Sequence, residues 1–223
     1  MNNNSTMHPQ HAALIAGSSL IAMAIFAAIG YGYAFNGIYS ANGEGNLLNQ
    51  GTLLRLTVAS FTAILWLDVL VTWALHELFK SVNQALSSLM AMFRLVYTAL
   101  LGIAIAQLLI AMELLKTPTC VAETIQQQLN LFLSIWSWGL VLFGMHLLVL
   151  AILVIKATHL PSAIGYLTFF AGMCYVAVHA LNLLWPSFAA YKNTVEAILG
   201  VPMALGELLL AVWLIYFAIK TNK

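Results

Sequence analysis

Charged residues are scarce in this chain: lysine, arginine, aspartate and glutamate make up 7% of its 223 residues, and hydrophobic residues make up 62%. An ordinary soluble domain carries about 25% charged residues, so this chain lacks the polar side chains that would cover a water-facing surface. The net charge of +1 supplies no basic patch, which excludes nucleic acid as a partner. These absences predict a polytopic membrane protein whose surroundings are membrane lipids.

Cysteine and the common catalytic motifs are almost missing as well. The two cysteines, Cys120 and Cys174, are expected in a loop and inside a membrane span, so no disulfide is predicted between them. Neither belongs to a zinc-type spacing. The chain contains no HExxH, no GxSxG and no phosphate-binding glycine loop. We therefore predict no metal site, the catalytic residues, if there are any, stay unknown, and no cofactor is strongly implied.

Six apolar stretches are long enough to cross a bilayer, which takes about 20 residues per helix. They cover residues 12–35, 53–79, 85–115, 129–155, 162–184 and 195–219. Runs of this length exclude the alternating pattern of a membrane β-barrel. The polar residues 1–11 lack the basic region of a signal peptide, so the first stretch is expected to be retained. The sequence predicts an all-α protein with a short N-terminal tail (1–11), one six-helix transmembrane bundle (12–219) and a C-terminal tail (220–223).

An even number of spans places both termini on one face of the membrane. That face collects four basic residues and the opposite face three, and three glutamates accompany the second set. The first set is Lys80, Lys156, Lys220 and Lys223, and the second is Arg55, Lys116 and Lys192 with Glu44, Glu123 and Glu196. The positive-inside rule therefore predicts that both termini are cytoplasmic.

Four ionisable residues fall inside the apolar stretches at a similar depth. Asp68, His146 and Glu207 each precede a lysine at the cytoplasmic end of the same helix by ten to thirteen residues. This separation corresponds to a rise of roughly 15–20 Å, and Arg94 lies roughly 18 Å along a helix that starts at the same face. Because intramembrane ionisable residues commonly mark function, Asp68, Arg94, His146 and Glu207 are the predicted polar cluster and candidate ligand-binding site.

Two interpretations of Arg94 remain open at this point. Its long side chain could snorkel to the headgroups, or it could form a buried ion pair with Asp68 or Glu207. The two carboxylates have short stems, so each is expected either to pair with a base or to be protonated. A lone histidine such as His146 is more often a hydrogen-bonded core residue than a ligand.

Four further polar residues are secondary candidates for the site. Tyr97 lies on the same helix as Arg94, and Thr72 follows Asp68 by one turn, where it is expected to share the hydrogen bonding of that residue. Tyr175 and His179 are one turn apart on a single helix face.

Four motifs, "FRLVYTALLG", "FGMHLLVLAILV", "HLPSAIGYLTFFAGMCY" and "LGELLLAVWL", resemble in sequence and order a bacterial membrane family known as domain of unknown function 4386. The resemblance covers roughly residues 12–219 and implies a location in the cell inner membrane. The positions that it marks as characteristic are Asp68, Arg94, His146, Pro161, Gly165, Tyr175, Glu207 and Trp213. Two residues depart from the pattern, since His76 replaces an expected aromatic residue and Ala151 replaces a usual glycine. The resemblance leaves the function open.

Three hypotheses about function follow. In the first, the polar cluster binds a small ligand that is anionic or linked to a proton, as in a transporter or a receptor-like protein. In the second, the protein is a non-catalytic accessory subunit that associates with other membrane subunits, and the cluster holds helices together. In the third, His146 and Asp68 or Glu207 belong to a membrane-embedded metal-dependent enzyme.

Overall fold

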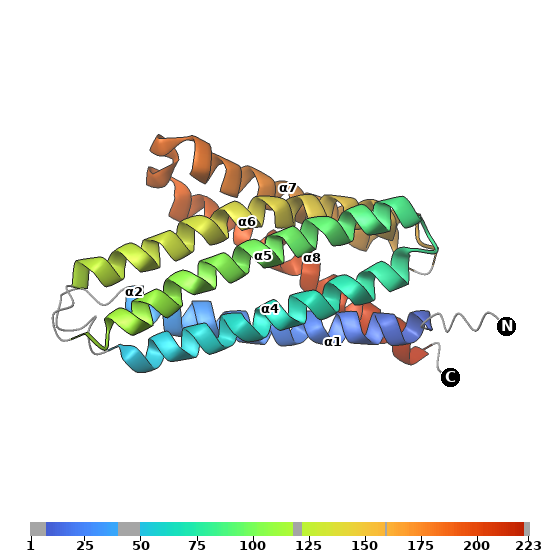
Figure 1. Cartoon of the computed structure of the whole chain (residues 1–223). Helices are drawn as coiled ribbons and strands as arrows, with labels where there is room; N and C mark the ends of the chain where they lie inside the picture. The colour runs from blue at the N-terminus through green and yellow to red at the C-terminus, as the bar shows by residue number, and fades with distance from the viewer. Residues whose placement is uncertain (1–7, 40–49, 118–121, 159, 221–223) are drawn as a thin grey trace.

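The computed structural model describes residues 8–39, 50–117, 122–158 and 160–220, which form six long helices running side by side (Figure 1). The first span combines three segments, α1 (Pro9–Ala27), the π-helix η1 (Ala28–Phe35) and α2 (Asn36–Tyr39). The remaining elements are α4 (Gly51–Phe79), α5 (Gln84–Leu114), α6 (Ala122–Lys156), α7 (Ser162–Leu184), the 3₁₀-helix η2 (Pro186–Ala190) and α8 (Lys192–Lys220). All six long helices are long and apolar enough to cross a membrane, and the chain is a multi-pass membrane protein, as its sequence predicts.

The helix ends follow local sequence signals. Pro9 occupies the first turn of α1, where its missing N–H would have no helical partner in any case. Asn83 caps α5 by accepting a hydrogen bond from the Leu86 N–H at 2.9 Å. Pro161 precedes α7 in an extended conformation.

Four helices are longer than the apolar pattern predicts, namely the first one, α4, α6 and α8, and the first one and α6 show the largest differences. The first helix starts at Pro9, within the predicted tail, and α6 starts at Ala122, about two turns before residue 129. The stretch "AETIQQQ" at the start of α6 consists mostly of good helix formers, and a helix that leaves the membrane can continue with polar residues. Hydropathy therefore marks the membrane-crossing part of a helix rather than its full length. Cys120, Glu44 and Lys223 lie outside the described residues.

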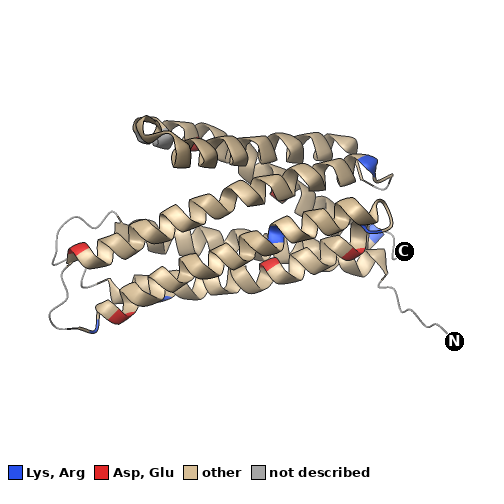
Figure 2. Ribbon diagram, turned by 45° about the horizontal axis from the view of Figure 1, so that its top comes forward, with Lys and Arg blue, Asp and Glu red and all other residues tan. Residues whose placement is uncertain are grey.

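The six helices form a closed ring in chain order. Each long helix packs against its neighbours in the sequence, and α8 completes the ring by packing against α1. The helix ends at Pro9 and Lys220 lie at the same end of the bundle, together with the turns after α4 and α6 (Figure 1). We call this the terminal end and the other the distal end. Charged residues gather near the two ends, and few occur midway along the helices (Figure 2).

Small residues bring neighbouring helices close together. A Cβ atom added to Gly144 of α6 would lie 2.9 Å from the carbonyl oxygen of Gly172 on α7. A Cβ on Gly17 of α1 would likewise lie 2.7 Å from the carbonyl oxygen of Ala211 on α8. Backbones this close favour van der Waals packing between helices in a membrane, where lipid is as apolar as the side chains.

The terminal half of the bundle is densely packed. Between the level of Arg94 and the terminal end, α4, α5 and α6 contribute apolar side chains that are at most 1% exposed; among them are Leu75, Phe79, Met90, Leu150 and Val154. Among the described residues, the distal half contains two cavities that are each lined by several helices, and they are described below. This asymmetry means that the interior is closed toward the terminal end and hollow toward the distal end.

Candidate functional site

A buried ion pair between Arg94 of α5 and Asp68 of α4 lies midway along the bundle. Arg94 Nε donates to Asp68 Oδ1 at 2.8 Å, and Arg94 Nη2 lies 2.6 Å from the same oxygen. Both side chains are completely inaccessible to solvent. Arg94 therefore pairs with a carboxylate and does not snorkel to the headgroups. The pair reduces the cost of a charge inside a membrane helix, which is about 2.5–3.5 kcal/mol on insertion scales.

His146 of α6 contacts the Arg94 guanidinium on another side, and its own hydrogen bonds define the tautomer of its imidazole ring. His146 Nδ1 lies 2.9 Å from the backbone oxygen of Met90, and a carbonyl oxygen can only accept, so Nδ1 carries the proton. His146 Nε2 lies 3.1 Å from Arg94 Nη1, and a guanidinium can only donate, so Nε2 is the acceptor. The hydrogen bonds are thus satisfied by a neutral imidazole that connects α5 to α6.

Glu207 of α8 lies at the edge of this cluster. Its Oε1 atom is 3.9 Å from Arg94 Nη1, which is an ion-pair contact longer than a hydrogen bond. The Glu207 side chain is 23% exposed, in contrast to the fully buried Arg94 and Asp68. The structure therefore brings the four predicted residues together around the guanidinium, and Glu207 is the member that meets open space.

Two residues that the sequence does not single out complete the surroundings of Arg94. Arg94 Nη2 donates to the sulfur of Met23 on α1 at 3.8 Å, and the guanidinium carbon lies 5.2 Å from the centre of the Phe143 ring on α6. A cation over an aromatic face is stabilised by the ring quadrupole. Nothing in an apolar helix pattern distinguishes Met23 or Phe143 from residues that face lipid.

A cavity of about 340 Å³, here called the central cavity, lies on the distal side of the cluster. All six long helices contribute to its lining. Its walls are mainly aromatic and aliphatic, and the carboxylate of Glu207 belongs to the lining. The aromatic members are Phe61, Tyr97, Trp136, Phe143 and Tyr175. An apolar pocket with a few convergent polar groups is the usual form of a small-molecule site.

The secondary candidates separate into three places. Tyr97 and Tyr175 line the central cavity, and each ring contacts Phe143, with centroid distances of 4.9 Å and 5.1 Å. Thr72 does bond to Asp68, but it donates to the main-chain oxygen at 2.7 Å and not to the carboxylate. His179 lies apart from the cluster, where its Nδ1 shares a 2.9 Å hydrogen bond with Ser137 Oγ.

No three histidine, cysteine, aspartate or glutamate side chains form a group that could hold a metal ion within the described parts of the chain. The position of the Arg94 guanidinium explains why these side chains do not form a metal site. Asp68 and Glu207 both lie within ion-pair distance of Arg94, and His146 accepts a hydrogen bond from it, so these three side chains surround a cation that is already present. Among the described residues, the metal-dependent enzyme hypothesis therefore gains no ligand set.

Comparison with known proteins identifies the family of this chain. Residues 15–217 match the family described as Domain of unknown function (DUF4386). The chain belongs to this family. It is also 32% identical over 177 residues to a protein of Archaeoglobus fulgidus described as uncharacterized, a match that covers 79% of this chain and 92% of that protein. No solved structure matches the chain.

Other positions that the DUF4386 resemblance marks serve helix packing. Pro161 precedes α7, and a Cβ on Gly165 would lie 2.5 Å from Ile155 Cγ1 and 3.2 Å from the Ala151 carbonyl oxygen. Ala151, which replaces a usual glycine, is fully buried at this contact. His76, the second departure, lies 3.1 Å through Nδ1 from Ser87 Oγ of α5. These residues hold neighbouring helices near the terminal end and lie away from the central cavity.

The role of His146 can be tested with two substitutions. We expect His146→Leu to lower the free energy of unfolding by about 1–3 kcal/mol, because it leaves a buried Arg94 N–H without an acceptor. His146→Gln is expected to recover most of this loss, since an amide can both accept and donate. Thermal unfolding of the detergent-solubilised protein measures both effects. Equal stability of the leucine variant and the unmodified protein would contradict a structural role for the imidazole.

Proposed function

We propose that the protein binds a small, largely apolar molecule carrying a positively charged amine in the central cavity, with Glu207 as the polar anchor. The observation that carries this proposal is the position of Glu207, whose partly exposed carboxylate lines an otherwise aromatic and aliphatic cavity. Aromatic walls and one carboxylate are a combination that recognises organic cations.

The charges of the cluster support a cation rather than an anion. Arg94 carries one positive charge, Asp68 and Glu207 as carboxylates carry two negative charges, and the hydrogen-bonded His146 is neutral. The sum is one excess negative charge in a low-dielectric interior, which a proton or a ligand cation would balance. The sequence leaves open an anionic ligand and a ligand linked to a proton, and the excess negative charge favours the second.

The hydrogen bonds of the cluster also favour a cationic ligand over an anionic one. The three guanidinium nitrogens already face protein acceptors on Asp68, His146 and Met23, so Arg94 has little to offer an anionic ligand. Acceptors, by contrast, are in excess. Among the described residues, Asp68 Oδ2 is buried without a hydrogen bond, and the only ion-pair contact of Glu207 is the one with Arg94 at 3.9 Å. Glu207 is the one of these two that lines the central cavity, and a ligand N–H group would supply it with a donor.

Three probes of matched size test the proposal. Phenylpropylamine, phenylpropanol and phenylpropionate are cationic, neutral and anionic forms of one skeleton. We expect the amine to bind most tightly to the protein in lipid nanodiscs, and Glu207→Gln to weaken its binding about tenfold or more, which corresponds to about 1.4 kcal/mol. Isothermal titration calorimetry measures these dissociation constants, with empty nanodiscs to subtract partitioning into lipid.

Glu123→Gln provides the matched control, because Glu123 is an exposed residue in the first turn of α6 and its replacement removes the same charge away from the cavity. Tighter binding of phenylpropionate, or equal amine binding by the Glu207→Gln and Glu123→Gln variants, would overturn the proposal. A stable heteromeric complex in mild detergent that binds none of the probes would support the accessory-subunit hypothesis instead.

We further propose that the protein resides in the cell inner membrane with both termini in the cytoplasm. Lys80, Lys156 and Lys220 belong to the terminal end of the bundle and, with Lys223 of the C-terminal tail, make four basic residues, against Arg55, Lys116 and Lys192 at the distal end. This distribution agrees with the positive-inside rule.

Reporter fusions test the orientation. We expect green fluorescent protein fused after Lys223 to fluoresce in a bacterial host, because it folds to a fluorescent form in the cytoplasm. Alkaline phosphatase fused at the same position is expected to be inactive, since it requires export to form its disulfides. The reverse pattern would place the terminal end outside.

A further inference from the structure

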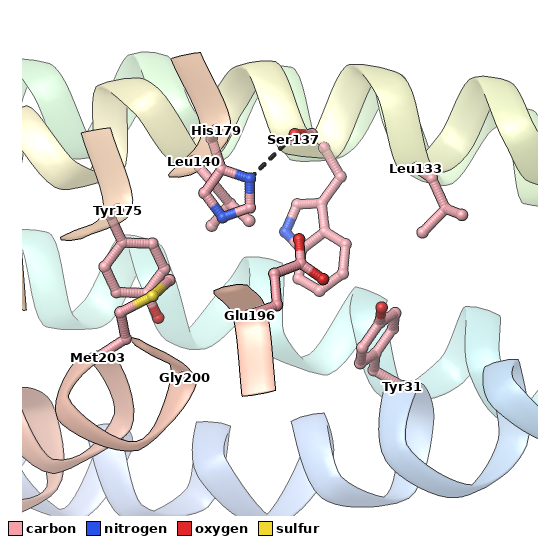
Figure 3. A pocket seen from close by; sticks show the side chains of 10 residues that line it. Tyr31, Leu133, Ser137, Leu140, Tyr175, His179, Glu196, Gly200 and Met203 are labelled. Carbon is pink, nitrogen blue, oxygen red and sulfur yellow. Dashed lines mark hydrogen bonds between the residues drawn. The ribbon is translucent and has the colours of Figure 1, made fainter. Parts of the chain in front are cut away.

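A second cavity, here called the distal cavity, lies between the central cavity and the distal end of the bundle. It has a volume of about 220 Å³ and is lined by η1, α6, α7 and α8 (Figure 3). Glu196 of α8 and Tyr31 of η1 direct their polar groups into this space (Figure 3). A polar network at its wall joins Ser137 Oγ to His179 Nδ1 at 2.9 Å and to Asn182 Nδ2 at 3.1 Å.

The two cavities are separated by one layer of side chains. Trp136, Leu140 and Tyr175 line both of them. The layer has aromatic neighbours on each side: Trp136 contacts Tyr31 at a centroid distance of 5.0 Å, and Tyr175 contacts Phe143 at 5.1 Å. Rotation of these side chains would join the cavities into one passage that leads from Glu196 to Glu207.

The helices around the distal cavity contain two irregular segments. The π-helix η1, which carries Tyr31, is eight residues long, although such helices are rare and are mostly short insertions near functional sites. Pro202 lies inside α8, where it cannot donate the usual helical hydrogen bond, and Gly200 precedes it in the lining of the cavity. Irregular backbone inside a membrane is tolerated where it lines a cavity, so both irregularities are consistent with a solvated passage.

We infer that the distal cavity is the access route by which an organic cation reaches the central cavity, with Glu196 at its mouth and Trp136, Leu140 and Tyr175 as its constriction. The inference rests on the proposed function, because it adds the route to the same ligand class. Glu196 in the distal cavity and Glu207 in the central cavity each lie beside aromatic rings. Both carboxylates attract a cation that moves along this route, and both repel an anion. The packed terminal half closes the opposite direction.

Thiol labelling tests the route without requiring ligand binding at Glu207. Ala24 of α1 lines the central cavity and not the distal one, so Ala24→Cys places a thiol beyond the constriction. Both native cysteines, Cys120 and Cys174, are replaced by alanine in this background. The probes are cationic (trimethylammonium)ethyl methanethiosulfonate and anionic sulfonatoethyl methanethiosulfonate, whose charges keep them out of lipid. In either reaction the thiolate attacks the thiosulfonate sulfur, a mixed disulfide forms and methanesulfinate leaves.

We expect the cationic probe to label the Ala24→Cys thiol about tenfold faster than the anionic probe, after each rate is divided by the rate of the same probe with a free thiol in solution, because the carboxylates steer it. Adding Glu196→Gln is expected to slow cationic labelling severalfold, and Glu123→Gln, at an exposed site outside the cavity, to leave it unchanged. Leu140→Trp should block labelling by filling the constriction. Leu131→Trp, on an exposed face of α6, is the matched control for that substitution.

Labelling rates that are equal for the two probes, or unaffected by both Glu196→Gln and Leu140→Trp, would overturn the route. If Leu140→Trp fails to fold, the Glu196→Gln and Glu123→Gln pair decides the question. A route confirmed by labelling together with amine binding that ignores Glu207→Gln would reject the proposed binding site and retain the passage.

Discussion

The ion pair between Arg94 and Asp68 is the interaction on which the rest of this structure depends. Two opposite charges sit completely buried on adjacent helices, and each would be costly in the membrane interior without the other. His146 and Met23 accept hydrogen bonds from the same guanidinium, so one side chain connects α5 to α4, α6 and α1. Glu207 then brings α8 into this network through a 3.9 Å contact. A ring of otherwise apolar helices thereby acquires a defined register at its centre.

The ion pair also divides the bundle into two halves with different physical character. On the terminal side, apolar side chains at most 1% exposed, such as Leu75 and Leu150, fill the interior. On the distal side, aromatic residues surround two cavities, and their carboxylates are Glu207 and Glu196. Because Arg94 is committed to Asp68 and His146, the negative charge of Glu207 is only weakly compensated within the cluster. This imbalance, rather than the arginine itself, gives the central cavity its proposed preference for a cation.

The sequence predicts the six spans, the family and the common depth of four ionisable residues, because these depend on hydropathy and on the constant rise of a helix. It leaves the choice between snorkelling and pairing of Arg94 open, since that choice depends on which face of α5 meets α4. Met23 and Phe143 contact the guanidinium from positions that no apolar pattern distinguishes. The π-helix at Ala28–Phe35 and the two cavities likewise depend on packing between helices, which sequence periodicity alone does not determine. The ligand role of the four residues stays a prediction.

A double-mutant cycle on Arg94 and Asp68 tests the central claim most directly. The free energies of unfolding of Arg94→Met, Asp68→Leu and the double variant are compared with that of the unmodified protein in the same detergent. Each single substitution removes one partner of the fully buried pair and is expected to cost about 3–5 kcal/mol. The double variant buries neither charge of the pair, leaves Glu207 as a partly exposed carboxylate, and should be more stable than either single variant. A coupling energy of about 2 kcal/mol or more is the predicted result. Additive losses, with coupling below about 0.5 kcal/mol, would contradict an organising role for the ion pair.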